Sequence, residues 1–295
     1  MLSYLKYRFK NLINYSKRQN GVTNILLSRQ NYKNIKDIRD AEIKVFSQNG
    51  EDGIIDFILK KLNIGDLKFI EVGVEDYEES NTRFLVETRP TTGLLIDNCK
   101  EINFIKKRDF FWKNELYLEN TEVSPENINS ILKKNNFFKS FDLFSIDIDG
   151  LDYWVLKEID FSKASIVVLE YNPLFGFEKL VSIPNIKNFS RNQYSKFYFG
   201  ASLKAYIELM KNKNYSFLGS NSFCNNAFFV NNKFAEIFHD IELKDLSNYC
   251  NFKFREKIFN DTKDYKIEMY KEIQDFELFD FEKNENEIIR KLFKI

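Results

Sequence analysis

Two near-continuous apolar runs constrain the fold of this chain most. They cover residues 141–148 and 164–171. Strands of a parallel sheet are buried on both faces and therefore read as unbroken apolar segments, whereas half-exposed strands alternate apolar and polar residues. Shorter strand-like segments at 67–72 and 93–97 precede them, with helical segments in between. This alternation predicts an α/β fold with a Rossmann-like, mostly parallel, doubly wound sheet.

The remaining elements follow from the periodicity of apolar residues. We expect helices at 54–62, 82–88, 125–134 and 202–213, and strands at 115–118, 215–218 and 227–230. These elements predict three regions: a helical N-terminal extension over residues 1–45, a Rossmann-like domain over 46–232 and a helical C-terminal extension over 233–295.

Charge and cysteine content exclude several classes of function. Lys+Arg and Asp+Glu both total 44, so there is no positive field of the kind that drives nucleic-acid binding. A structural zinc site needs about four Cys or His ligands, but the chain has three distant cysteines and the single histidine His239. Few unpaired cysteines are typical of the reducing cytoplasm, which is the location we expect.

The N-terminal segment raises the question of membrane contact. Residues 1–15 are basic and amphipathic but lack the apolar run of a signal peptide, and the sequence has no apolar stretch of membrane-spanning length. The segment could lie weakly on a membrane surface. Packing on its own domain or on a second subunit explains it more simply, and the aromatic-rich ends suggest a homodimer.

An acidic cluster follows the predicted strand at 141–148. Asp147, Asp149 and Asp152 flank Gly150 there. Because strand residues alternate between faces, Asp147 and Asp149 should point the same way. Two such carboxylates repel each other unless a cation, a proton or a donor-rich ligand lies between them, and ligands of open α/β sheets bind at the carboxyl ends of strands.

Other strand ends carry polar residues that should meet at the same edge of the sheet. Glu71 and Gly73 end the first strand, Asp97 ends the second, and Glu170 with Asn172 ends the fifth. The first turn is too poor in glycine for the dinucleotide fingerprint. An acid in the position of Asp97 suits ribose hydroxyls. A ligand with ribose, no phosphate and a positive charge fits this set, and S-adenosylmethionine (SAM) is such a ligand.

Several motifs resemble those of the FkbM-like SAM-dependent methyltransferases. They are the segments 47–53, 69–73, 79–82, 93–97, 144–154, 169–172, 198–204 and 225–229. The resemblance covers roughly residues 45–232 and implies a class I methyltransferase. It also implies O-methylation, often of a sugar in bacterial surface polysaccharide (capsule or lipooligosaccharide) biosynthesis or of a secondary metabolite. One departure is Glu75, which replaces the second glycine of the usual E/D-x-G-x-G-x-G loop.

The resemblance also implies residue roles. The SAM-binding residues would be Gln48, Glu71, Gly73, Glu75, Asn81, Asp97, Asn98 and Asp147, with Asp97 on the ribose and Asp147 nearest the methyl group. The acceptor would contact Glu170, Asn172, Tyr198, Ser202 and Lys204. Asp147, with Asp149, would be catalytic, either as a general base or with Glu170 as ligands of a divalent cation such as Mg²⁺ or Mn²⁺.

Structural interpretations stand beside these. Asp147, Asp149 and above all Asp152 could accept backbone N–H bonds in a capped turn. Asn172 could stabilise a turn, and Ser202 is a candidate helix N-cap.

Two other functions remain open at this point. Asp147-Ile-Asp149 fits the D-x-D pattern of metal-dependent glycosyltransferases, although that pattern leaves Asp97 unexplained. A non-catalytic interaction protein on a methyltransferase scaffold would explain the altered glycine loop. An open cleft lined by Asp97, Asp147 and Glu170 would argue against it.

Overall fold

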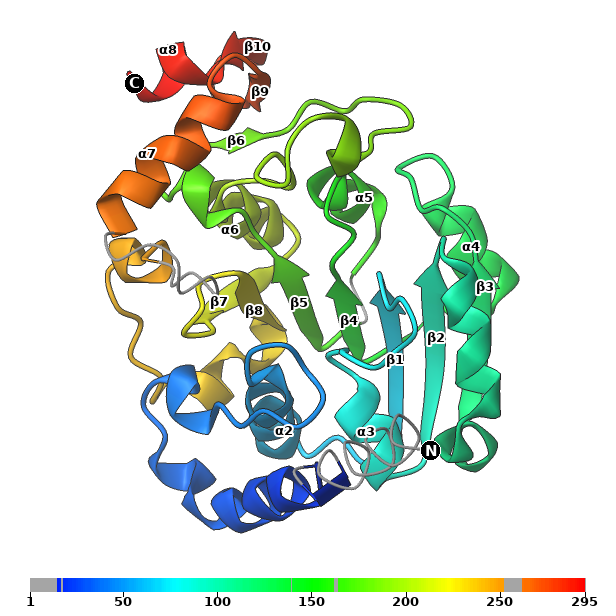
Figure 1. Ribbon diagram of the computed structural model, residues 1–295. Helices are drawn as coiled ribbons and strands as arrows, with labels where there is room; N and C mark the ends of the chain where they lie inside the picture. Colours follow the sequence, from blue (N-terminus) through cyan, green and yellow to red (C-terminus); the bar gives the residue numbers. More distant parts are fainter. Residues whose placement is uncertain (1–14, 17, 139, 162–163, 252–261, 295) are drawn as a thin grey trace, which may run out of the picture.

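A seven-stranded sheet forms the centre of the computed structural model (Figure 1), which describes residues 15–16, 18–138, 140–161, 164–251 and 262–294. Its order is β3-β2-β1-β4-β5-β8-β7. The strands are β1 (Leu67–Val72), β2 (Thr91–Asp97), β3 (Glu115–Asn120), β4 (Leu143–Ile146), β5 (Ile166–Glu170), β7 (Tyr215–Ser220) and β8 (Asn226–Asn231). The first five pair in parallel, and β8 is antiparallel to both neighbours. The predicted fold class is confirmed.

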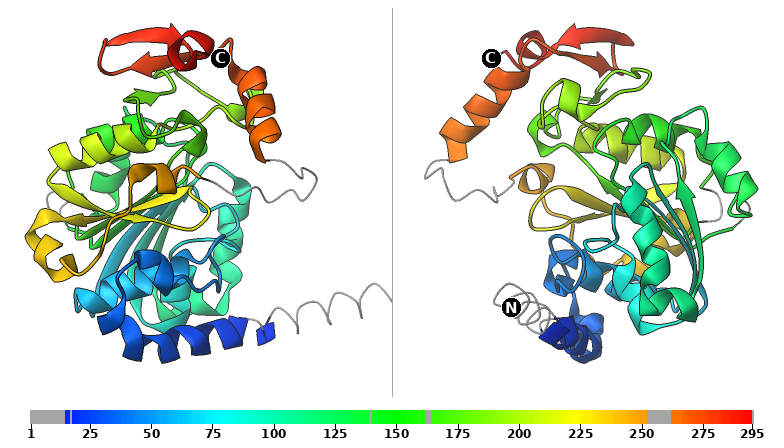
Figure 2. Two further views of the ribbon diagram at one scale, coloured as in Figure 1. Left: turned by 90° about the vertical axis from the view of Figure 1, so that its left-hand side faces the viewer. Right: turned by 45° about the vertical axis from the view of Figure 1, so that its right-hand side comes forward.

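Helices cover both faces of this sheet (Figure 2). They are α2 (Glu51–Lys61), α3 (Arg83–Thr88), α4 (Ile128–Lys134), α5 (Asp152–Glu158) and α6 (Leu203–Asn212). Two further helices, α7 (Thr262–Ile273) and α8 (Ile289–Phe293), contribute to a separate hydrophobic cluster. Short 3₁₀ segments are η1 (Arg29–Asn34), η2 (Ile38–Ala41), η3 (Lys100–Lys107), η4 (Asp109–Lys113), η5 (Pro173–Phe175), η6 (Arg191–Gln193), η7 (Asn232–Phe238) and η8 (Leu246–Tyr249). In the part of the chain described, no helix is long and apolar enough to cross a membrane.

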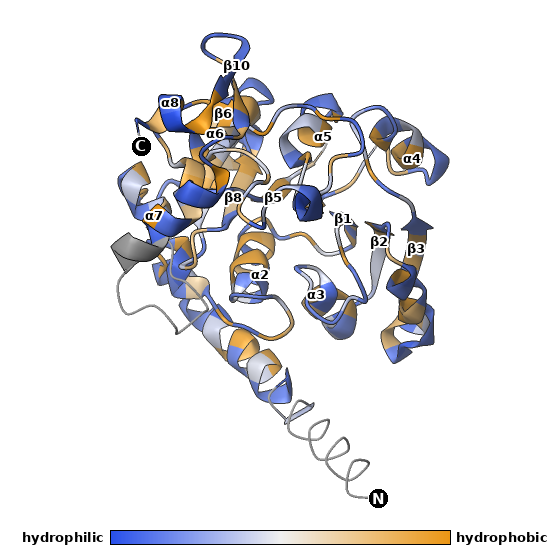
Figure 3. Ribbon diagram, turned by 45° about the horizontal axis from the view of Figure 1, so that its top comes forward, coloured by the Kyte–Doolittle hydropathy of each residue, from blue (hydrophilic) through white to orange (hydrophobic). Residues whose placement is uncertain are grey.

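Two hydrophobic clusters separate the helices from the sheet. One holds Phe57 of α2 and Phe84 of α3, and the other holds Ile131 of α4 and Val155 of α5. Apolar and polar positions alternate around α4 (Figure 3), which buries Ile131 and exposes its lysines. The strands between the two clusters are buried on both faces, which explains their unbroken apolar sequences.

The N-terminal region packs against the main core. Residues 18–28 are helical, and Ile25 and Ile38 are fully buried in the same cluster as Ile54 of α2. The basic stretch for which membrane contact was considered lies almost entirely outside the described residues.

The C-terminal region is only partly helical, which corrects the prediction of an all-helical extension. Strands β9 (Glu277–Asp280) and β10 (Glu285–Ile288) form a hairpin, and β9 also pairs with β6 (Val181–Ser182). Leu278 and Asp280 are buried while Glu277 is exposed. This is the period of a strand, and Asn284 turns the hairpin with a positive φ of 59°. The two strands are short and mix aromatic with charged residues, so the sequence pattern did not reveal this period.

Candidate functional site

A pocket of about 840 Å³ opens at the carboxyl edge of the parallel strands. The turns after β1, β2 and β4 and the last residue of β5 line one part of it, and residues 185–192, from the connection between β6 and α6, line another. Its volume is typical of a site for a small molecule. The lining includes Gln48, Glu71, Gly73, Glu75, Asn81, Asp97, Asn98, Asp147, Asp149 and Glu170, so the structure brings together every predicted SAM-binding residue.

Glu71 fixes the loop that follows β1. The side chain is buried, and its carboxylate accepts hydrogen bonds from Ser80 Oγ at 2.7 Å, Asn81 N at 2.8 Å and Thr82 N at 3.1 Å. Burial raises the pKa of Glu71 while these donors oppose the rise. Asn81 in turn donates from Nδ2 to Ser145 Oγ at 3.1 Å. Glu71 therefore shapes the pocket mainly by holding its neighbours.

The first turn keeps the backbone of a glycine-rich loop although it lacks two of the glycines. Gly73 has φ +85°, and a Cβ there would lie 1.7 Å from the carbonyl oxygen of Asp147. Glu75 and Tyr77 stand where the pattern has its second and third glycines, and both have positive φ, 47° and 64°. Non-glycine residues seldom adopt this conformation. Glu75 and Tyr77 thus adopt a left-handed conformation of the kind that glycine favours.

Asp97 stabilises the same turn from the neighbouring strand. Its Oδ2 accepts from Val74 N and Glu75 N, each at 2.8 Å, and its Oδ1 accepts from Cys99 N at 2.8 Å. A carboxylate oxygen can accept more than one hydrogen bond. Asp97 can therefore still accept hydrogen bonds from a ribose. It also stabilises the turn, a structural role that the sequence analysis did not predict.

The acidic cluster is present, but it forms in a different way from the one predicted. Asp147, Asp149 and Glu170 each place a carboxylate oxygen within 4.8 Å of the others. Strand alternation does not cause this, because β4 ends at Ile146. Instead the chain turns after Asp147, and Asp149 takes a left-handed conformation with φ +53°. The convergence was predicted correctly, and its cause was not.

Burial and mutual repulsion raise the pKa values of this cluster, and the Arg191 guanidinium offsets part of its negative charge. Burial, followed by repulsion from Asp149 and Asp152, raises the pKa of Asp147. Burial and then repulsion from Asp147 raise that of Glu170, and the two carboxyl groups share a hydrogen bond. Asp149 forms an ion pair with Arg191. The close carboxyl groups thus retain a proton between them at a pH at which isolated carboxylates are ionised.

Asp152 has the structural role that was considered for it. The side chain is buried at the start of α5 and accepts from Ile148 N and Gly150 N, both at 3.0 Å. Burial raises the pKa of Asp152 to about 6. Its two backbone donors close the turn that presents Asp149.

The comparisons with known proteins decide the family. Residues 47–217, more than half of the chain, match the Methyltransferase FkbM domain family. The chain belongs to the FkbM methyltransferase family. It is therefore a SAM-dependent methyltransferase, as the sequence motifs predicted. No curated protein matches this FkbM methyltransferase.

Solved structures resemble it at low sequence identity. The N-terminal domain of EvdMO1 with SAH bound is 11% identical with a TM-score of 0.42, over 63% of this chain and 80% of that one. The pyocyanin biosynthetic protein PhzM is 11% identical with a TM-score of 0.34, over 59% and 53%. An O-methyltransferase family protein from Burkholderia thailandensis is 10% identical with a TM-score of 0.33, over 71% and 70%.

The pocket of this FkbM methyltransferase fits SAM by its own features. Its lining has acids at the ends of β1, β2, β4 and β5, which favour a positively charged sulfonium. Gly73 leaves the turn after β1 without a side chain where a Cβ would overlap the Asp147 carbonyl oxygen. Gln48 and Asn98 also line the pocket, and both are exposed.

Four predicted acceptor residues do not line the pocket. Asn172 is buried and holds a turn, accepting from Leu174 N at 3.0 Å. The Tyr198 hydroxyl donates to the carbonyl oxygen of Glu277. Ser202 caps α6 by accepting from Ala205 N at 3.2 Å. Lys204, in the first turn of α6, donates to the Glu178 carbonyl oxygen at 2.8 Å. The structural interpretations of Asn172 and Ser202 therefore describe what these side chains do here.

Sequence analysis named no individual residue of the pocket wall formed by residues 185–192. It contributes Asn185, Lys187, Asn188, Phe189, Arg191 and Asn192. Lys187 and Arg191 are the two basic residues of the lining. No motif marked this segment, and its placement over the strand ends depends on the pairing of β6 far along the chain.

Proposed function

We propose that this methyltransferase transfers the methyl group of SAM to a sugar hydroxyl in bacterial surface polysaccharide (capsule or lipooligosaccharide) biosynthesis. The acid cluster at the end of β4 carries the proposal, because it places Asp147 in the pocket with a carboxyl neighbour that hydrogen-bonds to it. Asn185, Asn188 and Asn192 line the same pocket. Amides that both donate and accept suit an acceptor with several hydroxyl groups.

Asp147 would act as the general base. It would accept the proton of the acceptor hydroxyl as the hydroxyl oxygen bonds to the methyl carbon. In the same step the carbon–sulfur bond breaks, and its electron pair stays on sulfur. The raised pKa of Asp147 makes it a stronger base than an ordinary aspartate. The rest of catalysis is alignment of the reacting atoms, which rigid turns at the strand ends favour.

The binding roles follow from the position of each side chain. Gly73 and the loop held by Glu71 would flank the methionine part of SAM, and Asp97 with Asn98 the ribose. SAM would bring the electrophilic methyl group to this site. Glu170 lies in the pocket beside Asp147 and is the one predicted acceptor residue that can also face the acceptor.

Both alternatives have lost support. The family match accounts for the motifs that the glycosyltransferase hypothesis left unexplained. An open pocket lined by Asp97, Asp147 and Glu170 is the feature that argues against a non-catalytic scaffold. Cys99, Cys224 and Cys250 are all free, which supports the proposed cytoplasmic location.

Calorimetry with S-adenosylhomocysteine (SAH) and a methyl-transfer assay test the proposal together. Asp147→Asn should bind SAH as wild type does but lose most of the methyl transfer, on the order of a hundredfold or more. Glu126→Gln, an exposed carboxylate of the same pocket, should keep both. Absence of SAH binding at millimolar concentration in wild type, or full activity in Asp147→Asn, would contradict the proposal.

A further inference from the structure

The acid cluster carries more negative charge than its surroundings neutralise. Asp147, Asp149 and Glu170 lie together, and Arg191 is the basic side chain that forms an ion pair with one of them. If the three carboxylates are ionised, one guanidinium leaves a formal charge of minus two. Half-buried carboxylates are costly to hold in this state without a partner. A single divalent cation would balance that charge.

Glu170 provides a second, independent observation. Its Oε2 is buried and has no hydrogen-bond partner among the described residues, while its carboxyl group shares a hydrogen bond with Asp147. Buried polar atoms in folded proteins are almost always paired. The residue ends an otherwise apolar strand, β5, where packing alone would select an apolar side chain. The unpaired Oε2 of Glu170 therefore indicates a ligand that is coordinated by oxygen atoms.

We propose that Asp147, Asp149 and Glu170 bind one divalent cation, Mg²⁺ or Mn²⁺, and that the cation displaces Arg191 from Asp149. The three residues offer only oxygen ligands, which these hard cations prefer over the nitrogen and sulfur donors favoured by zinc. The inference deepens the proposed function, since a cation here would lower the pKa of an acceptor hydroxyl that reached it.

Displacement follows from where Arg191 binds. Its Nη1 contacts Asp149 Oδ1, and Asp149 must offer a carboxylate oxygen to the cation as well. A guanidinium and a dication repel each other at contact distance. Arg191 belongs to η6 at the pocket wall and its side chain is 31% exposed, so a long, partly solvated side chain can move away. Arg191 thus stabilises the acids without the cation and weakens cation binding.

Titration with Mn²⁺, followed by electron paramagnetic resonance and calorimetry on the full chain without SAM, tests the proposal. Wild type should bind one Mn²⁺, and Asp149→Asn and Glu170→Gln should each weaken binding by roughly tenfold or more because a charged ligand is lost. Arg191→Met should tighten it by roughly fivefold, since a nearby positive charge is removed. Mg²⁺ should compete with Mn²⁺ for the site.

Two control variants distinguish the effect of the Arg191–Asp149 ion pair from a general effect of charge in the pocket. Lys187→Met removes a positive charge from the same wall and should change Mn²⁺ affinity less than Arg191→Met does. Glu126→Gln removes an exposed pocket carboxylate and should change it little. Asp149 is 42% exposed at its side chain, so Asp149→Asn should fold even if Glu170→Gln does not.

Three results would overturn the proposal: no Mn²⁺ binding at millimolar concentration, unchanged affinity in Asp149→Asn, or equal or weaker affinity in Arg191→Met. SAH binding is measured on the same samples. Loss of SAH binding with intact Mn²⁺ binding would refute the methyltransferase proposal alone. SAH binding without Mn²⁺ binding would refute the cation site alone and leave Asp147 as the unaided base.

Discussion

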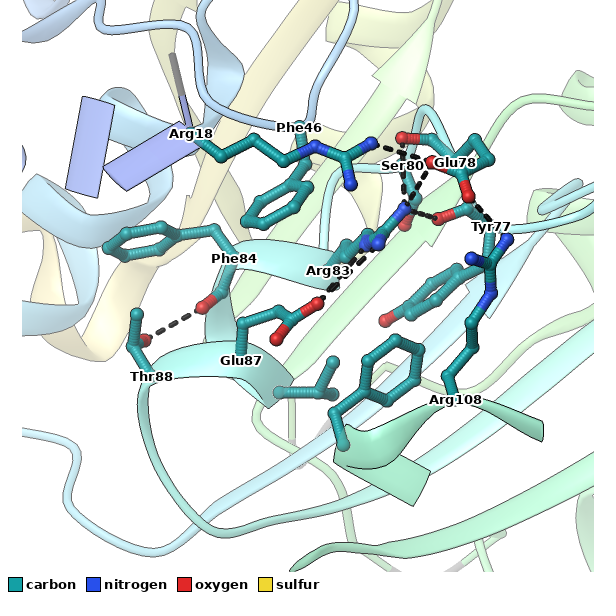
Figure 4. A network of polar contacts seen from close by, with 12 residues as sticks. Arg18, Phe46, Tyr77, Glu78, Ser80, Arg83, Phe84, Glu87, Thr88 and Arg108 are labelled. Carbon is teal, nitrogen blue, oxygen red and sulfur yellow. Dashed lines mark hydrogen bonds and ion pairs between the residues drawn. The ribbon is translucent and has the colours of Figure 1, made fainter. Parts of the chain in front are cut away.

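Glu78 lies at the centre of an ion-pair network beside the pocket loop (Figure 4). Its carboxylate pairs with Arg18 at 2.6 Å, with Arg83 at 2.9 Å and with Arg108. Arg83 is buried, and its guanidinium lies 4.6 Å from the centroid of the Phe46 ring. Partial burial alone would raise the pKa of Glu78, but hydrogen bonding to Arg18 and attraction to Arg83 and Arg108 outweigh it and lower the pKa to about 2.

The size of the effect follows from that pKa. A fall from the ordinary value of 4.5 to about 2 corresponds to at most about 3.4 kcal/mol of the free energy of unfolding at neutral pH. The Glu78 side chain is 35% exposed, and solvent screening reduces such contributions. We therefore expect Glu78→Gln to lower the free energy of unfolding by about 1.5 kcal/mol near neutral pH.

The pH dependence has a definite sign. The pKa of Glu78 is lower in the folded than in the unfolded chain, so its stabilisation is complete above about pH 4.5 and is lost as the pH falls toward about 2. Wild type should lose this advantage over Glu78→Gln on acidification. The difference between them should shrink to less than half by about pH 3.

Urea denaturation followed by circular dichroism measures that difference at several pH values. Glu87→Gln is the control, because Glu87 contacts Arg83 at 3.5 Å and is 33% exposed; it should cost about 0.5 kcal/mol or less. An equal loss in Glu78→Gln at neutral and at acidic pH would refute the electrostatic explanation. So would a loss no larger than that of the control.

Three further predictions concern the pocket loop and a residue outside the pocket. Gly73→Ala should cost roughly 2 kcal/mol of stability or more and abolish SAH binding in calorimetry, because the added Cβ would overlap the Asp147 carbonyl oxygen. Asp97→Ala should weaken SAH binding by roughly tenfold or more; unchanged affinity would remove the ribose assignment. Ser202→Ala should lower the free energy of unfolding by about 1 kcal/mol in thermal denaturation but leave the acceptor KM unchanged, and a raised KM would restore its predicted acceptor role.

Local pattern predicted the sheet well. The segment 67–72 was predicted as a strand, and β1 has those bounds. Strand β4 covers only Leu143–Ile146 of the predicted 141–148, and the chain turns after Asp147, with a positive φ at Asp149. Apolar periodicity detects burial, and burial continues past the last residue of the ladder: Gly150 is buried although it lies outside the strand. Strand ends are therefore the point at which such predictions lose accuracy.

The acids of the site could be predicted, whereas the individual residues of the 185–192 wall could not. Parallel strands with right-handed crossovers must bring their carboxyl ends to one edge, which is why Asp97, Asp147 and Glu170 were expected together. Lys187 and Arg191 reach the pocket through an irregular connection whose course depends on tertiary contacts. Polar residues in such a connection have no period that would indicate a direction.

Hydrogen-bond partners divide the strand-end acids into two kinds. The first kind accepts two or more backbone N–H bonds per residue and so stabilises turns; it comprises Glu71, Asp97 and Asp152. Asp147 and Glu170 hydrogen-bond to each other, and Glu170 retains an unpaired oxygen. The acids of the first kind stabilise the fold through these hydrogen bonds. Those of the second kind destabilise it, because they are buried and repel each other. The chemistry of the site should therefore depend on Asp147 and Glu170, and its architecture on the other three.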